Sequence, residues 1–256
     1  MKVAILGCGS IGGSIALRLK NRGWKVIVND IDKNIMGALK QRGIEGFKGY
    51  QDVSADVLLL CLPMNVEEKV LKDLRFPNIV MDVSSTMMPF VEIARGKKLH
   101  FIGGHPMAGN EKKGIAGWDP SMFEERTFFL CKTPEVNDLD ARKVLSLVGA
   151  LGADPILISA AKHDVIASKI SQSLFFLSAT ARYIGEEFEV FAGPGYDSTV
   201  RLSKQNPEMV MDMVKYNRVN ILKDLKEASE SLNGIIRLIE RDNTSELKKM
   251  FGGKGP

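Results

Sequence analysis

The first 159 residues alternate short apolar runs with amphipathic segments. The run KVAIL at 2–6 precedes a glycine-rich turn, and the segment 14–23 then places apolar residues at helical spacing and stops at a glycine. Similar apolar runs further along predict buried parallel strands with helices between them. The expected strands are 2–6, 25–30, 55–63, 78–85, 99–104, 127–132 and 155–159, and the expected helices include 14–23, 65–74 and 139–152. This alternation predicts a doubly wound α/β domain over residues 1–159.

The pattern changes after residue 159. Glycine becomes sparse, strand patterns disappear, and apolar residues recur at intervals of three and four. Asn206 stands as an N-cap and Pro207 at the first helical position, which predicts one long helix over 206–241. We expect an all-helical C-terminal domain over 160–250, whose apolar surface favours a homodimer, and a flexible tail over 251–256.

Composition narrows the class of protein. The 256 residues are 45% hydrophobic and 26% charged, and no apolar run is long enough to span a bilayer or to form a signal-peptide core, so we expect a cytoplasmic enzyme. Cys8, Cys61 and Cys131 are far apart and predict neither a disulfide framework nor a metal site. The net charge of +4 is spread along the chain, which argues against a nucleic-acid partner.

Three glycines between the first strand and the first helix form a dinucleotide-binding fingerprint. Gly7, Gly9 and Gly12 have the spacing GxGxxG, and Asp30 ends the second strand 23 residues after Gly7. The first glycine would permit a tight turn, the second a close approach to a pyrophosphate, and the third close packing of helix on strand. An acid at the position of Asp30 favours NAD over NADP, because it accepts ribose hydroxyls and repels a 2′-phosphate. The predicted domain is therefore of the Rossmann type. The expected cofactor-binding residues are Gly7, Gly9, Ser10, Ile11, Gly12, Asp30, Leu62 and Pro63.

A base that works near neutral pH is sought among three histidines. His105 lies in the stretch IGGHPMAGNEKKG, at the end of an expected strand, where ligands bind on such sheets. We interpret it as functional and expect it to titrate near the ordinary histidine value of about 6.5. His100 is interpreted as a surface or packing residue, and His163, beside Asp164 at a helix start, as a capping, domain-orienting or catalytic residue. Arg201, in the helical half, offers a fork for a carboxylate or is an ordinary surface arginine.

These motifs resemble those of the prephenate and arogenate dehydrogenase family. The stretch GGHPMAGNEKKG is similar to the family's GGHPMAGTEKSG, and DVSST, KHD and GYDSTVRLSKQNPEM follow the fingerprint in the family's order. The resemblance implies a Rossmann domain followed by a helical dimerisation domain, and NAD-dependent oxidative decarboxylation of prephenate to 4-hydroxyphenylpyruvate on the way to tyrosine. It implies catalytic roles for His105 and Ser85, and substrate-binding roles for Arg201, Glu111 and Ser171.

The sequence departs from the family pattern at a few positions. Gln172 and Phe175 replace the two histidines of the family's SHLPH segment, and Met87 stands where lysine is usual. The segment around Ser85 is also one residue shorter before His105, so Ser84 is an alternative for the inward-pointing serine.

Other functions stay open at this point. The substrate is prephenate or arogenate, and whether tyrosine inhibits the enzyme stays open. A β-hydroxyacid-type dehydrogenase of the same build would use a lysine of the helical domain, for which Lys169 and Lys204 are candidates. A non-catalytic NAD-binding sensor would explain the fingerprint and the apolar helices but not the histidine stretch.

Overall fold

The protein, described here as a computed structural model over residues 1–252, divides into two compact units. The first comprises Met1–Ala167 and Pro207–Tyr216, and the second comprises Ser168–Asn206 and the chain from Asn217 onward. The expected boundary near residue 160 remains a prediction. Of the expected flexible tail, residues 251–252 end a helix and residues 253–256 lie outside the described part of the chain.

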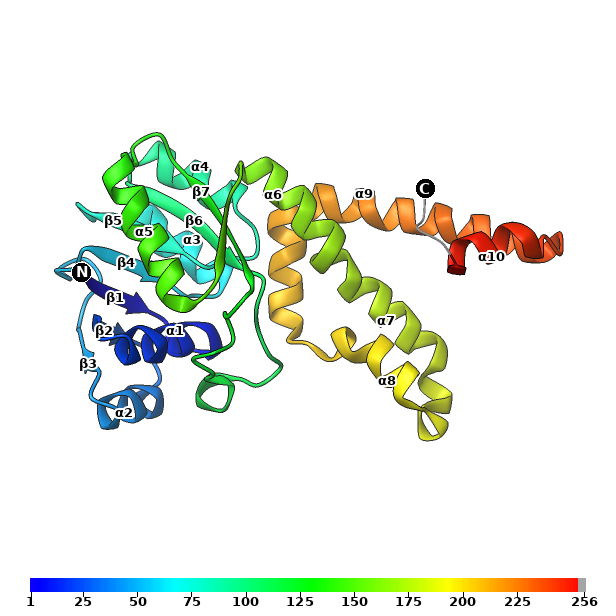
Figure 1. Cartoon of the computed structure of the whole chain (residues 1–256), viewed down its shortest axis with the longest axis horizontal. Coiled ribbons are helices and arrows are strands. Elements are labelled where there is room, and N and C mark those ends of the chain that lie inside the picture. Colours follow the sequence, from blue (N-terminus) through cyan, green and yellow to red (C-terminus); the bar gives the residue numbers. More distant parts are fainter. Residues whose placement is uncertain (253–256) are drawn as a thin grey trace. The chain divides into compact units, whose positions relative to one another are not determined.

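The first unit is built on a single eight-stranded sheet with the strand order β3-β2-β1-β4-β5-β6-β7-β8 (Figure 1). Its central strands are continuous apolar runs buried on both faces, as parallel strands covered by helices must be. The Rossmann-type fold is confirmed. The strands are β1 (Lys2–Leu6), β2 (Lys25–Asn29), β3 (Glu45–Gly46), β4 (Val57–Leu60), β5 (Ile79–Asp82), β6 (Phe101–Pro106), β7 (Thr127–Lys132) and β8 (Asp154–Leu157).

One strand pairing differs from a fully parallel sheet. β7 runs antiparallel to β6, with His105 opposite Phe129, while all other neighbouring pairs are parallel. The chain leaves β6 at the carboxyl edge and returns along β7 through the loop 107–126, which contains only the short 3₁₀ helix η1 (Gly114–Gly117). Because no helix carries the chain back to the opposite edge, β7 must start at the edge where β6 ends.

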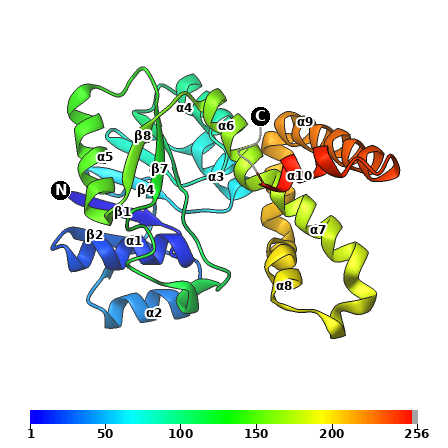
Figure 2. The same cartoon turned by 45° about the vertical axis from the view of Figure 1, so that its right-hand side comes forward.

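Helices cover both faces of the sheet. α1 packs on α5 on one face, and α3 packs on α4 on the other (Figures 1 and 2). The sequence pattern did not single out α2 and α4, which are short and bury few residues each. The helices of this part are α1 (Ser10–Asn21), α2 (Lys33–Gln41), α3 (Met64–Asp73), α4 (Met88–Gly96), α5 (Asp138–Leu151) and α6 (Ala160–Ala167).

The remaining chain is helical, as expected. A π-helical turn (Ser168–Gln172) leads into α7 (Ser173–Gly185), η3 (Glu186–Phe191), α8 (Pro194–Val200) and η4 (Arg201–Lys204). The long helix α9 (Pro207–Glu240) is followed by α10 (Thr244–Gly252). Among residues 1–252, no helix is both long and apolar enough to cross a membrane.

The predicted long helix exists, but it is interrupted. Asn217 has non-helical angles (φ −130°, ψ 28°) inside α9. Its buried amide donates to Oε1 of Gln172 at 2.7 Å and its side-chain oxygen accepts from Asn220 at 2.7 Å. A side-chain network that competes with the helical backbone is an ordinary cause of a kink.

Candidate active site

The glycine turn has the backbone geometry that its three glycines require. Gly7 has φ +87°, and a Cβ there would lie 2.3 Å from the carbonyl oxygen of Cys61. A Cβ at Gly12 would lie 2.0 Å from the carbonyl oxygen of Gly7. Around Gly9, by contrast, an added Cβ meets nothing within 4 Å. Gly7 and Gly12 are therefore needed for the turn itself, whereas Gly9 keeps an open surface at the start of α1.

Asp30 ties this turn to the end of β2. Its carboxylate accepts hydrogen bonds from the amide of Cys8 at 2.6 Å and of Asp32 at 2.8 Å. The side chain is only partly buried. Nearby, burial and the charge of Asp30 raise the pKa of the Cys8 thiol to about 12, so this cysteine is an inert packing group.

The other predicted cofactor residues surround the same edge of the sheet. Ile11 packs against the core at the start of α1, and Pro63 stands before α3, where Leu62 approaches Gly7. Ser10 donates a hydrogen bond of 3.0 Å to the carbonyl oxygen of Gly117 in the loop that follows His105. The glycine turn after β1 and the histidine stretch after β6 are far apart in the sequence, but they lie at the same edge of the sheet.

Trp118, which was not among the predicted site residues, adds a second contact between this loop and the glycine turn. Its indole nitrogen lies 3.1 Å from the carbonyl oxygens of Cys8 and Gly9, and an added Cβ at Gly13 would lie 1.8 Å from that nitrogen. The signal in the sequence is the extra glycine after the fingerprint: Gly13 leaves room for a ring from another segment.

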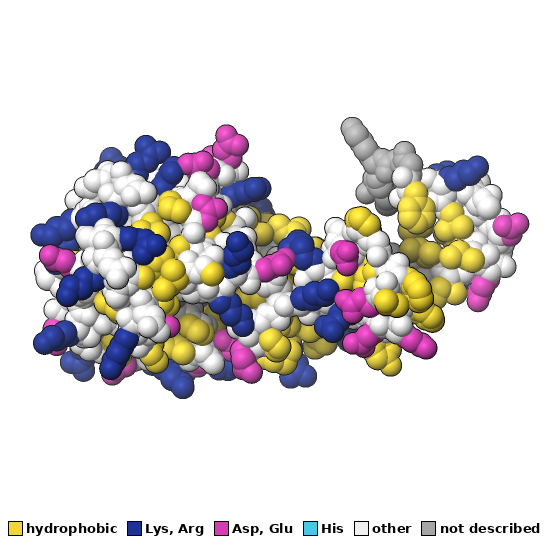
Figure 3. All heavy atoms as spheres, turned by 90° about the horizontal axis from the view of Figure 1, so that it is seen from below, with side chains coloured by type: hydrophobic (Ala, Val, Ile, Leu, Met, Phe, Trp, Pro, Cys, Tyr) yellow, Lys and Arg dark blue, Asp and Glu magenta, His cyan; other side chains and the backbone are white. Residues whose placement is uncertain are grey.

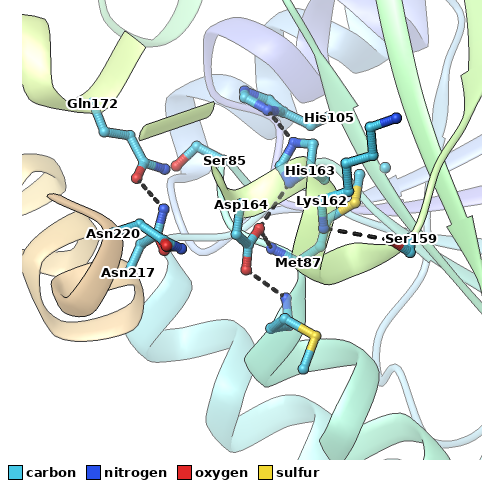
Figure 4. A network of polar contacts seen from close by, with 12 residues as sticks. Ser85, Met87, His105, Ser159, Lys162, His163, Asp164, Gln172, Asn217 and Asn220 are labelled. Carbon is cyan, nitrogen blue, oxygen red and sulfur yellow. Dashed lines mark hydrogen bonds and ion pairs between the residues drawn. The ribbon is translucent and has the colours of Figure 1, made fainter. Parts of the chain in front are cut away.

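His105 lies near the carboxyl end of β6 with only 9% of its surface exposed. Its Nδ1 atom lies 2.9 Å from Nε2 of His163, which is fully buried, and the two rings meet edge to face (Figure 4). Roles were predicted for both histidines, but their pairing was not, because they are 58 residues apart in the sequence. Periodicity and motif spacing carry no information on such a contact.

Asp164 extends this pair to the start of α4. Its Oδ1 lies 2.8 Å from Nδ1 of His163 and accepts the amide of Met87 at 2.7 Å, while Oδ2 accepts the amide of Met88 at 2.9 Å (Figure 4). The carboxylate of Asp164 lies at the positive end of α4, where the helix macrodipole favours it. Asp164 belongs to α6, whose N-cap residue Ser159 accepts the amide of Lys162 at 3.4 Å.

The titration expected for His105 is wrong. Burial and the neighbouring His163 lower the pKa of His105 to about 3, well below the ordinary value of about 6.5. The apolar wall of the sheet disfavours the charged ring, which the sequence could not reveal. His105 is therefore neutral across the physiological range.

A buried carboxyl pair lies behind His105. Asp82, at the end of β5, accepts the amide of Gly104 at 2.6 Å, and Glu67 on α3 interacts with Asp82 and accepts the hydroxyl of Ser84. Burial raises the pKa of Asp82 to about 7 and that of Glu67 well above its ordinary range. The hydroxyl of Ser84 is thus engaged inside the protein. Ser85, half-buried and 3.9 Å from the sulfur of Met64, is the better candidate for a ligand contact.

The remaining predicted site residues lie elsewhere in their units. Glu111 is exposed in the loop 107–113 of the first unit. Within the second unit, Ser171 belongs to the π-helical turn, a feature that is frequent at functional sites, and Arg201 begins η4 with an exposed side chain. Gln172, which replaces a family histidine, is buried and bonded to Asn217.

The two lysines of the rival dehydrogenase hypothesis are engaged in ion pairs. Lys169 lies 2.9 Å from Asp224 and 2.7 Å from Glu227, which raise its pKa, and Lys204 lies 3.2 Å from Glu189. Within the described residues no three His, Cys, Asp or Glu side chains are grouped so as to hold a metal ion.

A glycine-turn Rossmann sheet with a buried histidine at its carboxyl edge, followed by a helical unit, is the build of a nucleotide-dependent dehydrogenase, and the chain is an enzyme of that class. Residues 15–157 match the family model of the prephenate dehydrogenase nucleotide-binding domain, and residues 157–253 match that of the prephenate dehydrogenase dimerization domain. The chain belongs to the prephenate dehydrogenase family.

Individual relatives are distant but cover almost the whole chain. Prephenate dehydrogenase of Lactococcus lactis subsp. cremoris is 26% identical over 98% of this chain and 74% of its own length. The solved arogenate dehydrogenase of Synechocystis is 26% identical, with a TM-score of 0.79 over 98% of this chain and 96% of its own. Prephenate dehydrogenase from A. aeolicus, solved with hydroxyphenyl propionate and NAD+, is 24% identical and shares the fold, with a TM-score of 0.85 over 98% and 94% of the two chains.

Proposed function

We propose that this enzyme oxidises and decarboxylates prephenate to 4-hydroxyphenylpyruvate with NAD. The observation that carries the proposal is the position of His105: a neutral, buried imidazole at the carboxyl edge of the sheet whose first strand ends in the glycine turn. Ligands of such sheets bind beyond that edge. A neutral ring there is suited to accept the hydrogen bond of a ring hydroxyl.

The residues of the turn fit a dinucleotide. The open space at Gly9 admits a pyrophosphate, the first amides of α1 face it, and Asp30 is placed to accept the hydroxyls of an adenosine ribose. Both the carboxylate of Asp30 and the NAD+ found in the A. aeolicus relative support NAD as the cofactor. When bound, NAD+ would accept a hydride from the substrate ring.

The chain's own residues would then handle the hydroxyl and the carboxylates. His105 accepts the hydroxyl's hydrogen bond as the hydride leaves, with Ser85 contributing from the neighbouring strand end. Arg201 offers a planar fork for a substrate carboxylate, with Ser171 and Glu111 as further substrate-binding residues. Loss of carbon dioxide makes the ring aromatic, which drives the reaction forward.

Prephenate is proposed rather than arogenate because the curated relative from Lactococcus lactis is a prephenate dehydrogenase. Arogenate, the substrate named for the Synechocystis relative, is the second candidate. Formation of reduced cofactor is to be measured with prephenate and arogenate, each with NAD and NADP. The proposal expects the highest kcat/KM for prephenate with NAD. A higher kcat/KM for arogenate would make arogenate the substrate. Turnover of neither compound would overturn the proposed function.

We also propose that the enzyme is a homodimer formed by its helical part. The second unit exposes large apolar side chains: Tyr183, Ile184, Val190, Phe191 and Val219 are each at least 75% exposed. Hydrophobic side chains, drawn in yellow, are visible on the surface of this unit in Figure 3. Apolar side chains in such number mark an interface, and the match to a dimerization domain agrees with one between two copies. Light scattering after gel filtration should give twice the chain mass of 28.2 kDa; a monomer would contradict the proposal.

A further inference from the structure

We propose that His163 is a positioning residue for His105: it accepts a hydrogen bond from Nδ1 of His105 and so keeps the lone pair of His105 on Nε2. The use of that lone pair rests on the proposed function. The protonation pattern does not, because it follows from the contacts of His105, His163 and Asp164 alone.

The pattern starts at Asp164. Its carboxylate faces donors from three sides: the amides of Met87 and Met88 at 2.7 and 2.9 Å, and Nδ1 of His163 at 2.8 Å. A carboxylate that is held by backbone amides acts as an acceptor, so the ring nitrogen that faces it must carry a proton. His163 therefore has its proton on Nδ1, and in the neutral ring the lone pair is on Nε2.

That lone pair determines the state of His105. The 2.9 Å contact between Nε2 of His163 and Nδ1 of His105 needs one donor and one acceptor. Because Nε2 of His163 accepts, Nδ1 of His105 donates, and neutral His105 presents its lone pair on Nε2. The opposite tautomer would set two lone pairs against each other in a place where His163 has no exposed surface.

The same contacts can stabilise the charge that the reaction creates. When the substrate hydroxyl gives its proton to Nε2 of His105, the Nδ1 proton can pass to Nε2 of His163, so that one proton enters and one moves on. The positive charge then lies beside the carboxylate of Asp164, with the pair Asp82 and Glu67 behind Gly104 as the other nearby acidic groups. Placing the charge on His163 avoids the cost of charging His105 itself, because burial lowers the pKa of His105 to about 3.

Nitrogen-15 NMR of histidine-labelled enzyme tests the tautomer directly. The chain has three histidines: His100→Phe, at a partly exposed position that pairs with Asp140, identifies the signals of His100, and His163→Gln identifies those of His163, which leaves those of His105. We expect His105 to be protonated at Nδ1 and unprotonated at Nε2 in the unsubstituted enzyme and in His163→Gln, where the amide oxygen replaces the accepting nitrogen. In His163→Phe, which packs a ring against Phe129 but accepts nothing, His105 should lose this pattern.

Kinetics separate positioning from a purely structural role. We expect His163→Phe to lower kcat by roughly 10²-fold and His163→Gln by roughly 10-fold, because glutamine keeps the tautomer but cannot take up the proton; KM for NAD should stay the same in both. A proton on Nε2 of His105 in the unsubstituted enzyme or in His163→Gln would overturn the inference, even if His163→Phe fails to fold. So would an unchanged tautomer and kcat in a folded His163→Phe. If the enzyme turns over neither substrate, the proposed function fails, whereas the NMR pattern still decides the inference.

Discussion

The backbone amide of Gly104, the residue directly before His105, donates a 2.6 Å hydrogen bond to Oδ1 of Asp82. Asp82 is fully buried and shares its surroundings with the equally buried Glu67. Two carboxyl groups so placed cannot both ionise at low cost, because burial and mutual repulsion each favour the neutral form. The support of the candidate site therefore depends on at least one retained proton.

The shared proton of Asp82 and Glu67 predicts that the free energy of unfolding falls as the pH rises from about 5 to 7. A carboxyl group whose folded pKa lies above its unfolded value of about 4 binds a proton in the folded state that the unfolded chain has released, so unfolding is favoured with rising pH until the folded pKa is passed. The pKa of Asp82, raised to about 7, sets the upper end of this pH range. Thermal unfolding as a function of pH measures it.

Glu67→Gln should reduce that loss by about 1 kcal/mol, or roughly 2–4 °C in the melting temperature, because an amide can donate to Asp82 and accept from Ser84 without a charge. The neighbouring Glu68→Gln is the control. Contacts with Lys215, Lys72 and Tyr216 lower the pKa of Glu68 to about 2, so its ionisation is complete well below pH 6. An unchanged pH slope in Glu67→Gln would contradict the shared proton.

The glycine turn offers a matched pair of substitutions. In Gly9→Ala the added Cβ meets nothing within 4 Å, so the free energy of unfolding should change by less than about 0.5 kcal/mol, while the affinity for NAD falls by roughly 10-fold or more because the methyl group occupies the pyrophosphate's place. In Gly12→Ala the Cβ lies 2.0 Å from a backbone oxygen, and unfolding itself should be easier by about 2 kcal/mol or more. Calorimetric binding and denaturant unfolding of both variants check this. Equal effects of the two on stability would refute the distinction.

Asp30 predicts the choice between the two nicotinamide cofactors. We expect kcat/KM with NAD to exceed that with NADP at least tenfold, about 1.4 kcal/mol, because the carboxylate repels a 2′-phosphate. Asp30→Asn should narrow the ratio by removing the charge. Asp32→Asn keeps an N-cap acceptor for the amide of Asn34 and serves as the control with an unchanged ratio. Equal use of both cofactors by the unsubstituted enzyme would disprove the role of Asp30.

The sequence predicted this sheet well because its strands are continuous apolar runs, a pattern that depends on burial alone. The antiparallel direction of β7 was not predictable, since TFFLCK is a continuous apolar run that gives the same pattern in either direction. The helices α2 and α4 were not predicted because each has only nine residues, which leaves few positions in which a helical period can be recognised.

For the site, motifs identified positions but not partners. The stretch around His105 and the glycine turn could be read from residue type and spacing, because backbone geometry demands glycine at Gly7 and Gly12. The pairing of His105 with His163 arises only when α6 packs beside α4, and the low pKa of His105 follows from that burial. Long-range packing of this kind leaves no periodic trace in a single sequence.

His105 and Arg201 should differ in the kinetic parameter that they control. If His105 accepts the hydroxyl's hydrogen bond mainly as the hydride leaves, His105→Asn lowers kcat by roughly 10²-fold or more with little change in KM. His100→Asn, at a partly exposed histidine paired with Asp140, should leave both parameters unchanged.

Arg201→Ala should instead raise KM for the substrate by about 10-fold to 100-fold, the worth of a charge-assisted hydrogen bond of roughly 1.5–3 kcal/mol, with a smaller loss of kcat. Arg201→Lys keeps the charge but not the planar fork, so its KM should lie between those of the unsubstituted enzyme and Arg201→Ala. Steady-state kinetics of the variants decide the assignment, and the reverse pattern for His105 and Arg201 would exclude it.

The lowered pKa of His105 makes a final prediction about the acid side of the activity profile. Histidine must be neutral to accept a hydrogen bond, and a ring with its pKa near 3 stays neutral well below the pH at which an ordinary histidine, with a pKa of about 6.5, becomes charged. In the unsubstituted enzyme, kcat/KM should therefore vary less than about threefold between pH 7.5 and pH 5.5, where titration at 6.5 would cost about tenfold. Measurement in buffers of constant ionic strength, at temperatures below the unfolding range of each pH, checks this. An acid limb centred near 6.5 that is absent from His100→Asn would assign the titration to His100, and one that persists in that variant would show that His105 is more easily charged than its burial beside His163 implies.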